Sequence, residues 1–203
     1  MNSGPNTFAG YEVSLPEVEK NVSLDSAVGK AISQVRNQLG TFLSTIDADN
    51  PFAGKIVRGE GNEMVEKPLL DSHIYLVDDD PTVSRAFKRI LGGKKFSNIQ
   101  TFNDGQEAFE HMHKDGQWVE IPDLIISDTN MPHMDGPKLA MALQNIEASK
   151  RPRFLALTGQ FNDENIKTYV ELGYPVMCKP VNNGNFLAMT VHELRQDPGF
   201  KAA

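Results

Sequence analysis

Acidic residues follow two short apolar segments of the chain and can together hold a metal ion. Asp78 and Asp79 come directly after the run HIYLV, and Asp128 comes directly after DLIIS. Two carboxylates crowded at one strand end repel each other unless they share a cation. Their hard oxygen atoms suit Mg²⁺, which prefers oxygen ligands in octahedral geometry. The three residues therefore predict a Mg²⁺ site, to which Asp128 contributes from a second strand end.

Two further side chains follow later apolar runs, and each also has an ordinary structural explanation. Thr158 ends the run FLALT and could stabilise a turn, while Lys179 follows VMC and could be a solvated charge. Asp80, before Pro81, is better explained as a helix N-cap. Taken together, an acid pair, an acid, a hydroxyl and an ammonium match a phosphoryl-transfer site. Metal and ammonium neutralise a transferring phosphoryl group, and a carboxylate can accept it covalently.

The elements that must position these residues alternate along the chain. Five short apolar runs predict strands, and a helical pattern follows each run. The runs are HIYLV (73–77), FSNIQTF (96–102), DLIIS (123–127), RFLAL (153–157) and PVMC (175–178). This alternation predicts an α/β fold: a five-stranded parallel, doubly wound sheet of the flavodoxin-like order 2-1-3-4-5 with five helices. Ligands of such sheets bind at the carboxyl ends of the strands, where the acidic residues lie.

The ordered motifs resemble the response-regulator receiver family of two-component signalling. Members of that family carry an acidic pair after the first strand, an Asp and an MPxMDG-like stretch after the third, a Thr or Ser after the fourth, and Lys-Pro after the fifth. The matching positions here are Asp78 and Asp79, Asp128 with MPHMDG (131–136), Thr158 with Gly159, and Lys179 with Pro180. The resemblance covers residues 71–197, nearly two-thirds of the chain.

The resemblance implies that Asp128 accepts a phosphoryl group from a histidine kinase or a phosphotransfer protein. Mg²⁺ would be held by Asp79, Asp128 and the backbone carbonyl of Asn130, with Asp78 acting through water. The domain would signal through protein–protein contacts and would not be an enzyme, except that it assists its own phosphorylation and dephosphorylation.

The same resemblance assigns the hydroxyl and the ammonium to the switch. Lys179 would bind a phosphoryl oxygen, and Thr158 would turn to hydrogen-bond the phosphoryl group. That movement would repack the surface of the fourth helix, fifth strand and fifth helix of the domain. One position departs from the family pattern, because Val176 stands where members often carry Tyr or Phe, three residues before the lysine. We therefore expect a variant or weak relay behind Thr158.

Two alternative functions fit parts of the sequence. The stretch DDDPT (78–82) also matches the DxDxT pattern of haloacid-dehalogenase-like phosphatases, with Asp78 as nucleophile. That family needs a further acidic pair after the lysine, and the reading leaves Asp128 unexplained. A phosphorylation-independent docking module is the other alternative. Its usual mark is loss of an acid, the Thr or the Lys, and none of these is lost here.

Residues 1–70 show a different pattern, with one helical stretch over residues 22–47 and a predicted linker over residues 48–70 that is rich in Gly, Pro and charge. The apolar positions of the stretch recur at intervals of three or four and form one stripe. They are Leu24, Val28, Ala31, Val35, Leu39, Phe42 and Ile46. The stripe could pack on the receiver. Since five helices already cover the sheet, we predict instead that it mediates self-association or partner docking, and that removing residues 1–70 leaves a folded, phosphorylatable monomer.

Composition narrows the cellular setting. The 203 residues include 27 acidic and 20 basic side chains, a net charge of −7. We therefore expect no basic surface that would bind nucleic acid. No apolar run approaches the roughly 20 residues that span a bilayer, and the N-terminus lacks a signal-peptide pattern. The single cysteine, Cys178, cannot form an intramolecular disulfide. We expect a cytoplasmic protein with a tail over residues 198–203.

Overall fold

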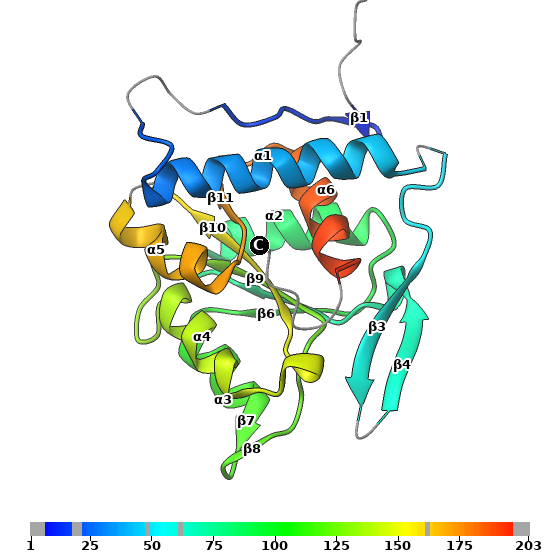
Figure 1. Cartoon of the computed structure of the whole chain (residues 1–203). Coiled ribbons are helices and arrows are strands. Elements are labelled where there is room, and N and C mark those ends of the chain that lie inside the picture. The colour runs from blue at the N-terminus through cyan, green and yellow to red at the C-terminus, as the bar shows by residue number, and fades with distance from the viewer. Residues whose placement is uncertain (1–6, 18–21, 48, 61–62, 161–162, 197–203) are drawn as a thin grey trace, which may run out of the picture.

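A five-stranded parallel sheet lies at the centre of the computed structural model, which describes residues 7–17, 22–47, 49–60, 63–160 and 163–196 (Figure 1). The strands run in the order β11-β10-β9-β5-β6. Their bounds are β5 (Ile74–Val77), β6 (Ile99–Phe102), β9 (Leu124–Asp128), β10 (Arg153–Thr158) and β11 (Val176–Cys178). Counted along the chain, this is the order 2-1-3-4-5, so the predicted flavodoxin-like sheet is confirmed.

Five helices follow the five strands, as predicted. They are α2 (Pro81–Gly92), α3 (Gly105–Met112), α4 (Gly136–Ala142), α5 (Asp163–Leu172) and α6 (Asn183–Leu194). Helix α4 is shorter than its sequence pattern and continues as two 3₁₀ turns, Leu143–Asn145 and Ala148–Lys150. The guanidinium of Arg151 donates to the carbonyls of Gln144 and Ile146, each at 3.0 Å, and so satisfies groups that a longer helix would have paired.

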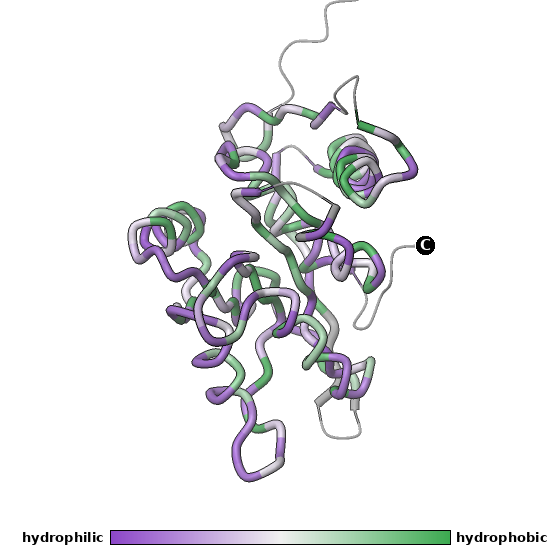
Figure 2. The backbone as a smooth tube through the Cα atoms, turned by 90° about the vertical axis from the view of Figure 1, so that its left-hand side faces the viewer, coloured by the Kyte–Doolittle hydropathy of each residue, from purple (hydrophilic) through white to green (hydrophobic). Residues whose placement is uncertain are grey.

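The helices enclose one apolar core on each face of the sheet. Along β5, Ile74 and Leu76 enter one core while Tyr75 and Val77 enter the other, as strand periodicity requires. Helices α2 and α6 cover the first face, and α3, α4 and α5 cover the second. In Figure 2 the strongly hydrophobic stretches run through the interior, and the hydrophilic ones gather in the outer loops.

The N-terminal helix α1 (Ala27–Thr45) packs along the sheet edge formed by β11 and contacts α5 and α6 (Figure 1). Its stripe enters both cores, since Val35 and Leu39 join the α6 side whereas Val28 and Ala31 join the α5 side. The prediction that this stripe is free for self-association or partner docking is therefore wrong. The five receiver helices cover the two faces of the sheet but leave its β11 edge open, and α1 closes that edge.

The segment predicted as a linker over residues 48–70 contains a β-hairpin, which corrects that prediction. Strand β3 (Lys55–Glu60) pairs antiparallel with β4 (Glu63–Pro68), and the 3₁₀ turn Leu69–Asp71 leads into the sheet. Lys67 forms an ion pair of 2.6 Å with the fully buried carboxylate of Asp123. This pair anchors the hairpin to the start of β9, a contact between distant parts of the chain that local composition does not reveal.

Two smaller antiparallel pairs were not predicted either. Strands β1 (Thr7–Phe8) and β2 (Tyr11–Glu12) pack on α6, and β7 (His113–Lys114) pairs with β8 (Gln117–Trp118) after α3. The predicted tail over residues 198–203 lies outside the described residues. Within the described ranges, no helix has both the length and the hydropathy required to cross a bilayer.

Candidate functional site

Three of the predicted site residues meet at the carboxyl ends of β5, β9 and β11. Asp78 follows β5, Asp128 ends β9, and Lys179 follows β11. The ammonium of Lys179 lies 2.6 Å from Oδ2 of Asp78 and also donates to Oδ1 of Asp128. One cation is thus shared by two carboxylates from neighbouring strands, at the switch point of the sheet where such folds bind ligands.

Each carboxylate in this cluster is also oriented by a backbone amide. The N–H of Asp80 donates to Oδ1 of Asp78 at 2.9 Å, and the N–H of Asn130 donates to Oδ2 of Asp128 at 2.7 Å. In each of the two carboxylates, one oxygen therefore accepts from Lys179 and the other accepts from the loop that follows its own strand. A carboxylate oxygen has more than one lone pair, so both groups can still bind a further ligand.

Burial sets the electrostatics of the cluster. Asp78 is 5% exposed and Asp128 is 7% exposed, and buried charges are stable in proteins when they are paired. Burial raises the pKa of Asp78, and the hydrogen bond from Lys179 offsets only part of that effect. Burial alone would lower the pKa of Lys179, but its hydrogen bonds to Asp128 and Asp78 raise the pKa above the ordinary value of 10.5. The ammonium therefore stays charged at neutral pH.

The other two acids after β5 have different surroundings. Asp79 is exposed to solvent. Asp80 caps α2, because its carboxylate accepts from the N–H of Thr82 at 2.7 Å, and that backbone hydrogen bond lowers the pKa of Asp80. The capping role predicted for Asp80 is therefore confirmed.

The donor atoms fit Mg²⁺ in kind. Asp78, Asp79, Asp128 and the carbonyl of Asn130 offer only oxygen, which Mg²⁺ prefers. Among the described residues, no group of three or more His, Cys, Asp or Glu side chains is already gathered around one metal position. In the resting arrangement the ammonium of Lys179 supplies the positive charge between the two carboxylates, and Asp79 stays in solvent.

Thr158, the last residue of β10, is fully buried, and within the described residues its hydroxyl forms no hydrogen bond with either carboxylate. Its hydroxyl donates to the carbonyl of Gln160 at 2.8 Å and accepts from the N–H of Gln160 at 3.1 Å. The carbonyl of Thr158 accepts from the N–H of Lys179 at 2.7 Å. The structure therefore joins Thr158 to Lys179 through the backbone, while its hydroxyl is engaged in its own loop.

The loop over residues 129–135, which carries most of the MPHMDG stretch, is fixed at several points. The N–H of Gly105 donates to the carbonyl of Met134 at 3.0 Å, and Nδ1 of His133 lies 2.7 Å from Oδ2 of Asp104. The hydroxyl of Thr129 donates to the carbonyl of Leu157 at 3.0 Å. The position of Asp128 thus depends on both α3 and β10.

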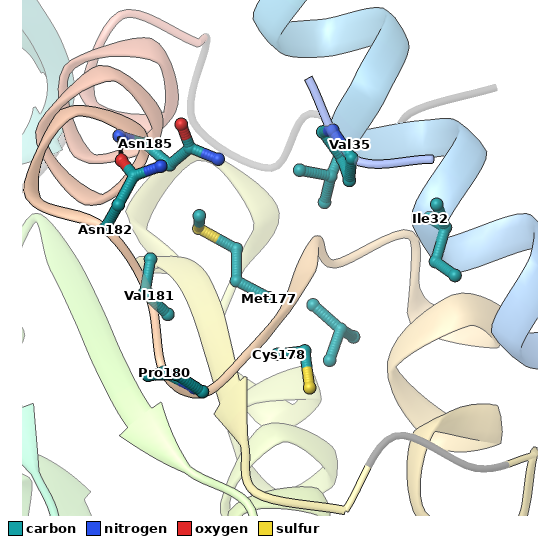
Figure 3. Close-up of a pocket in the computed structure, with 10 residues that line it drawn as sticks. Ile32, Val35, Met177, Cys178, Pro180, Val181, Asn182 and Asn185 are labelled. Carbon is teal, nitrogen blue, oxygen red and sulfur yellow. Dashed lines mark hydrogen bonds between the residues drawn. The ribbon is translucent and has the colours of Figure 1, made fainter. Parts of the chain in front are cut away.

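Between α1 and β11 lies a cavity of about 190 Å³ that the sequence did not predict (Figure 3). Ile32 and Val35 of α1 face it from one side, and Met177 and Val181 face it from the other. Val176, at the position where the receiver family often has an aromatic residue, is 1% exposed and lines the same space. The cavity forms where α1 lies over β11. These segments are far apart in the sequence, so no local sequence pattern could have predicted the cavity.

Comparisons with known sequences agree with this geometry. Residues 74–190 match the family model described as the response regulator receiver domain. The probable chemotaxis protein CheY of Rhizobium etli is 30% identical over 109 residues, which are 53% of this chain and 80% of that protein. The osmosensing histidine protein kinase SLN1 of Saccharomyces cerevisiae is 26% identical over 146 residues, 68% of this chain. The matched part is only 12% of the kinase.

Solved structures show the same relationship. The chemotaxis response regulator CheY4 of Vibrio cholerae superposes with a TM-score of 0.50 and 26% identity, covering 58% of this chain and 94% of CheY4. The signal receiver domain of a histidine kinase from Syntrophus aciditrophicus gives a TM-score of 0.52 and 28% identity, with 61% and 89% covered. Each neighbour is almost fully covered, whereas this chain has elements beyond the family match, which begins after α1 and the β3–β4 hairpin.

Proposed function

Because this chain belongs to the response regulator receiver domain family, we propose that it is a signalling switch in which Asp128 accepts a phosphoryl group. The observation that carries this proposal is the shared ammonium of Lys179, which contacts both Asp78 and Asp128 at the switch point of the sheet. A cation held between two carboxylates is positioned to receive an anionic group that arrives at either of them.

The chemistry follows from the positions of these groups. An oxygen of Asp128 attacks the phosphorus of a phosphohistidine, the P–N bond breaks, and the imidazole leaves with the bonding electron pair. Lys179 then binds an oxygen of the new acyl phosphate in place of its hydrogen bond to the carboxylate. The N–H of Asn130 continues to orient Asp128, and Thr158 turns from Gln160 toward the phosphoryl group.

We assign the Mg²⁺ ligands to Asp79, Asp128 and the carbonyl of Asn130, with Asp78 acting through water. When bound, Mg²⁺ neutralises charge on the transferring phosphoryl group. Asp79 is exposed to solvent, so its side chain can change rotamer on metal binding without leaving a buried environment. Asp78 keeps its hydrogen bond from the N–H of Asp80 in this arrangement.

The proposed partners are a histidine kinase or phosphotransfer protein as donor and a protein as output target. The similarity to a protein named as a histidine kinase supports the first of these. The resemblance assigns output to the surface of α5, β11 and α6, and α1 covers part of that surface, so α1 belongs to the output face. The proposal includes a cytoplasmic location, with which the free thiol of Cys178 is consistent.

Intact-mass measurement tests the acceptor. The wild-type protein, incubated with Mg²⁺ and acetyl phosphate, should gain the mass of one phosphoryl group, and hydroxylamine should remove it. Asp128→Asn should gain none, since it keeps the shape but lacks the nucleophilic oxygen. Asp115→Asn is the matched control, because Asp115 is exposed in the β7–β8 turn and its positive φ of 51° suits Asn. Equal hydroxylamine-sensitive phosphate on Asp128→Asn would refute the assignment.

A further inference from the structure

The hydroxyl of Tyr169 is a buried polar group without a hydrogen bond. The side chain lies on α5 and is 0% exposed, and its hydroxyl is not bonded to any described residue. Buried hydroxyls in proteins nearly always have a partner, so an exception needs an explanation. Burial also raises the pKa of Tyr169, which keeps the hydroxyl protonated and therefore a donor.

This hydroxyl points at the backbone of the acceptor residue. A Cβ atom placed on Gly136 would lie 2.2 Å from the hydroxyl oxygen of Tyr169, 2.3 Å from the carbonyl oxygen of Asp128 and 3.2 Å from Oγ of Ser127. Three oxygens thus surround one point that only a glycine leaves empty. The glycine of the MPHMDG stretch therefore makes room for Tyr169 to reach from α5 to the main chain of Asp128.

Two oxygens in this space can accept from Tyr169 after a small shift. The carbonyl of Asp128 accepts one hydrogen bond, from Ser127 at 2.8 Å, and has a second lone pair. The hydroxyl of Thr129 is near enough to Tyr169 to lower the pKa of the phenol in part, although the two groups do not meet the geometry of a hydrogen bond, and the proton of Thr129 goes to the carbonyl of Leu157. Leu157 directly precedes Thr158 in β10. The carbonyl that holds the hydroxyl of Thr129 therefore belongs to the residue next to the switch threonine.

We propose that Tyr169 is a positioning residue of the switch: its hydroxyl gains an acceptor in the 128–136 loop only after Asp128 is phosphorylated, and this bond draws α5 toward the site. This role rests on the proposed function of Asp128. It also answers the departure at Val176, because the aromatic residue absent from β11 is replaced by one on α5. The ring of Tyr169 stacks on Phe154 of β10, with centroids 5.8 Å apart and planes at 29°.

The same helix carries the change to the N-terminal element. Helix α5 packs directly on α1, and the side-chain amide of Gln34 donates to the carbonyl of Gly173 at 3.2 Å, just after α5 ends. A displacement of α5 toward the acceptor loop must therefore alter its packing on α1. Helix α1, which lies outside the matched residues 74–190, would thereby change its packing when the protein is phosphorylated.

The substitution Tyr169→Phe tests this role, because it keeps the ring and removes only the hydroxyl. The variant should accept the same amount of phosphate from acetyl phosphate as the wild type. Its resting form should be at least as resistant to urea, since a buried unpaired hydroxyl is lost. Its amide resonances in α5 and α1 should move only part of the wild-type distance on phosphorylation, reflecting a conversion equilibrium lowered by roughly two- to tenfold, the effect of one hydrogen bond.

Tyr174→Phe is the matched control, since Tyr174 is also buried but its hydroxyl accepts from the side-chain amide of Gln144 at 3.0 Å. It should lose resting stability and keep the full shift of resonances. A full shift in Tyr169→Phe, or a loss of resting stability equal to that of Tyr174→Phe, would overturn the inference while leaving phosphorylation of Asp128 intact. A wild-type protein that gains no phosphate would refute the proposed function, and the inference with it.

Discussion

Helix α1 should be part of the cooperative fold of the receiver, and one pair of leucine substitutions measures this directly. Leu39 is 0% exposed within the core on the α6 side, whereas Leu24, from the same apolar stripe of the sequence, is 65% exposed. Leu→Ala at a fully buried site costs about 2–5 kcal/mol, because transfer free energy is lost and a cavity remains. The same change at an exposed site is expected to stay within about 0.5 kcal/mol.

The magnitude is large compared with total stability. A domain of ordinary size is stable by roughly 5–15 kcal/mol, so Leu39→Ala should remove a substantial fraction of the free energy of unfolding. Leu24→Ala removes the same atoms from the chain but almost no packing. The difference between the two variants therefore isolates the contribution of burial at the α1 interface.

Urea unfolding followed by the fluorescence of Trp118 is the assay. Trp118 is the single tryptophan and lies in the β7–β8 pair against Phe109, away from α1. In a two-state transition, loss of packing at α1 must shift the midpoint seen by this distant probe. If Leu39→Ala and Leu24→Ala give the same Trp118 midpoint, α1 does not belong to the cooperative unit. The same reasoning reverses the expectation that a chain lacking residues 1–70 stays folded, because both cores would be opened.

Three further predictions concern single contacts. Gly136→Ala should destabilise the protein by about 1–3 kcal/mol or more, because its Cβ would overlap a backbone oxygen. Gly92→Ala is the control and should be neutral or slightly stabilising, since a Cβ there meets open space. Thermal unfolding of the two variants measures the difference. Lys67→Met should cost about 1.5–3 kcal/mol in urea unfolding, because the buried carboxylate of Asp123 loses its cation but still accepts from the N–H of His73, whereas Lys55→Met, from an exposed pair, should change stability by less than about 1 kcal/mol. Asp104 is partly desolvated, which opposes ionisation, but the N–H of Glu107 and the neighbouring histidine lower the pKa of Asp104 below its ordinary value of 3.8. The ionised Asp104 therefore stabilises the folded protein above that value, and this stability is lost as pH falls through the folded pKa. Asp104→Asn should flatten the acid limb of a plot of stability against pH, and an unchanged limb would contradict the assignment.

Local sequence signals sufficed for the sheet and for most of the candidate site. The strands are short apolar runs with a helical pattern after each, and the right-handed crossover rule leaves few strand orders for five parallel strands. Because side chains at parallel strand ends share one edge, Asp78, Asp128 and Lys179 were expected to meet there, and the structure brings them together. The same rule did not separate the buried Asp78 from the exposed Asp79, because both residues directly follow β5.

Contacts between distant segments account for what the sequence did not reveal. An apolar stripe shows that one side of α1 is buried but not what buries it, and β11 lies far along the chain. The ion pair of Lys67 with Asp123 turns a charged, Gly-rich stretch into an anchored hairpin. Tyr169 occupies an ordinary apolar position of its helix, and only the space beside Gly136 shows where its hydroxyl goes.

The coverage of β11 by α1 has a consequence for solubility. Edge strands present unpaired backbone groups and are templates for pairing with another chain, which leads to aggregation. The opposite edge, β6, has only four residues, and β11, with three, is closed by α1. A fusion or truncation that loosens α1 would uncover backbone groups and apolar side chains together. Such a protein should precipitate or form oligomers through its sheet edge while its helices and strands are still largely formed.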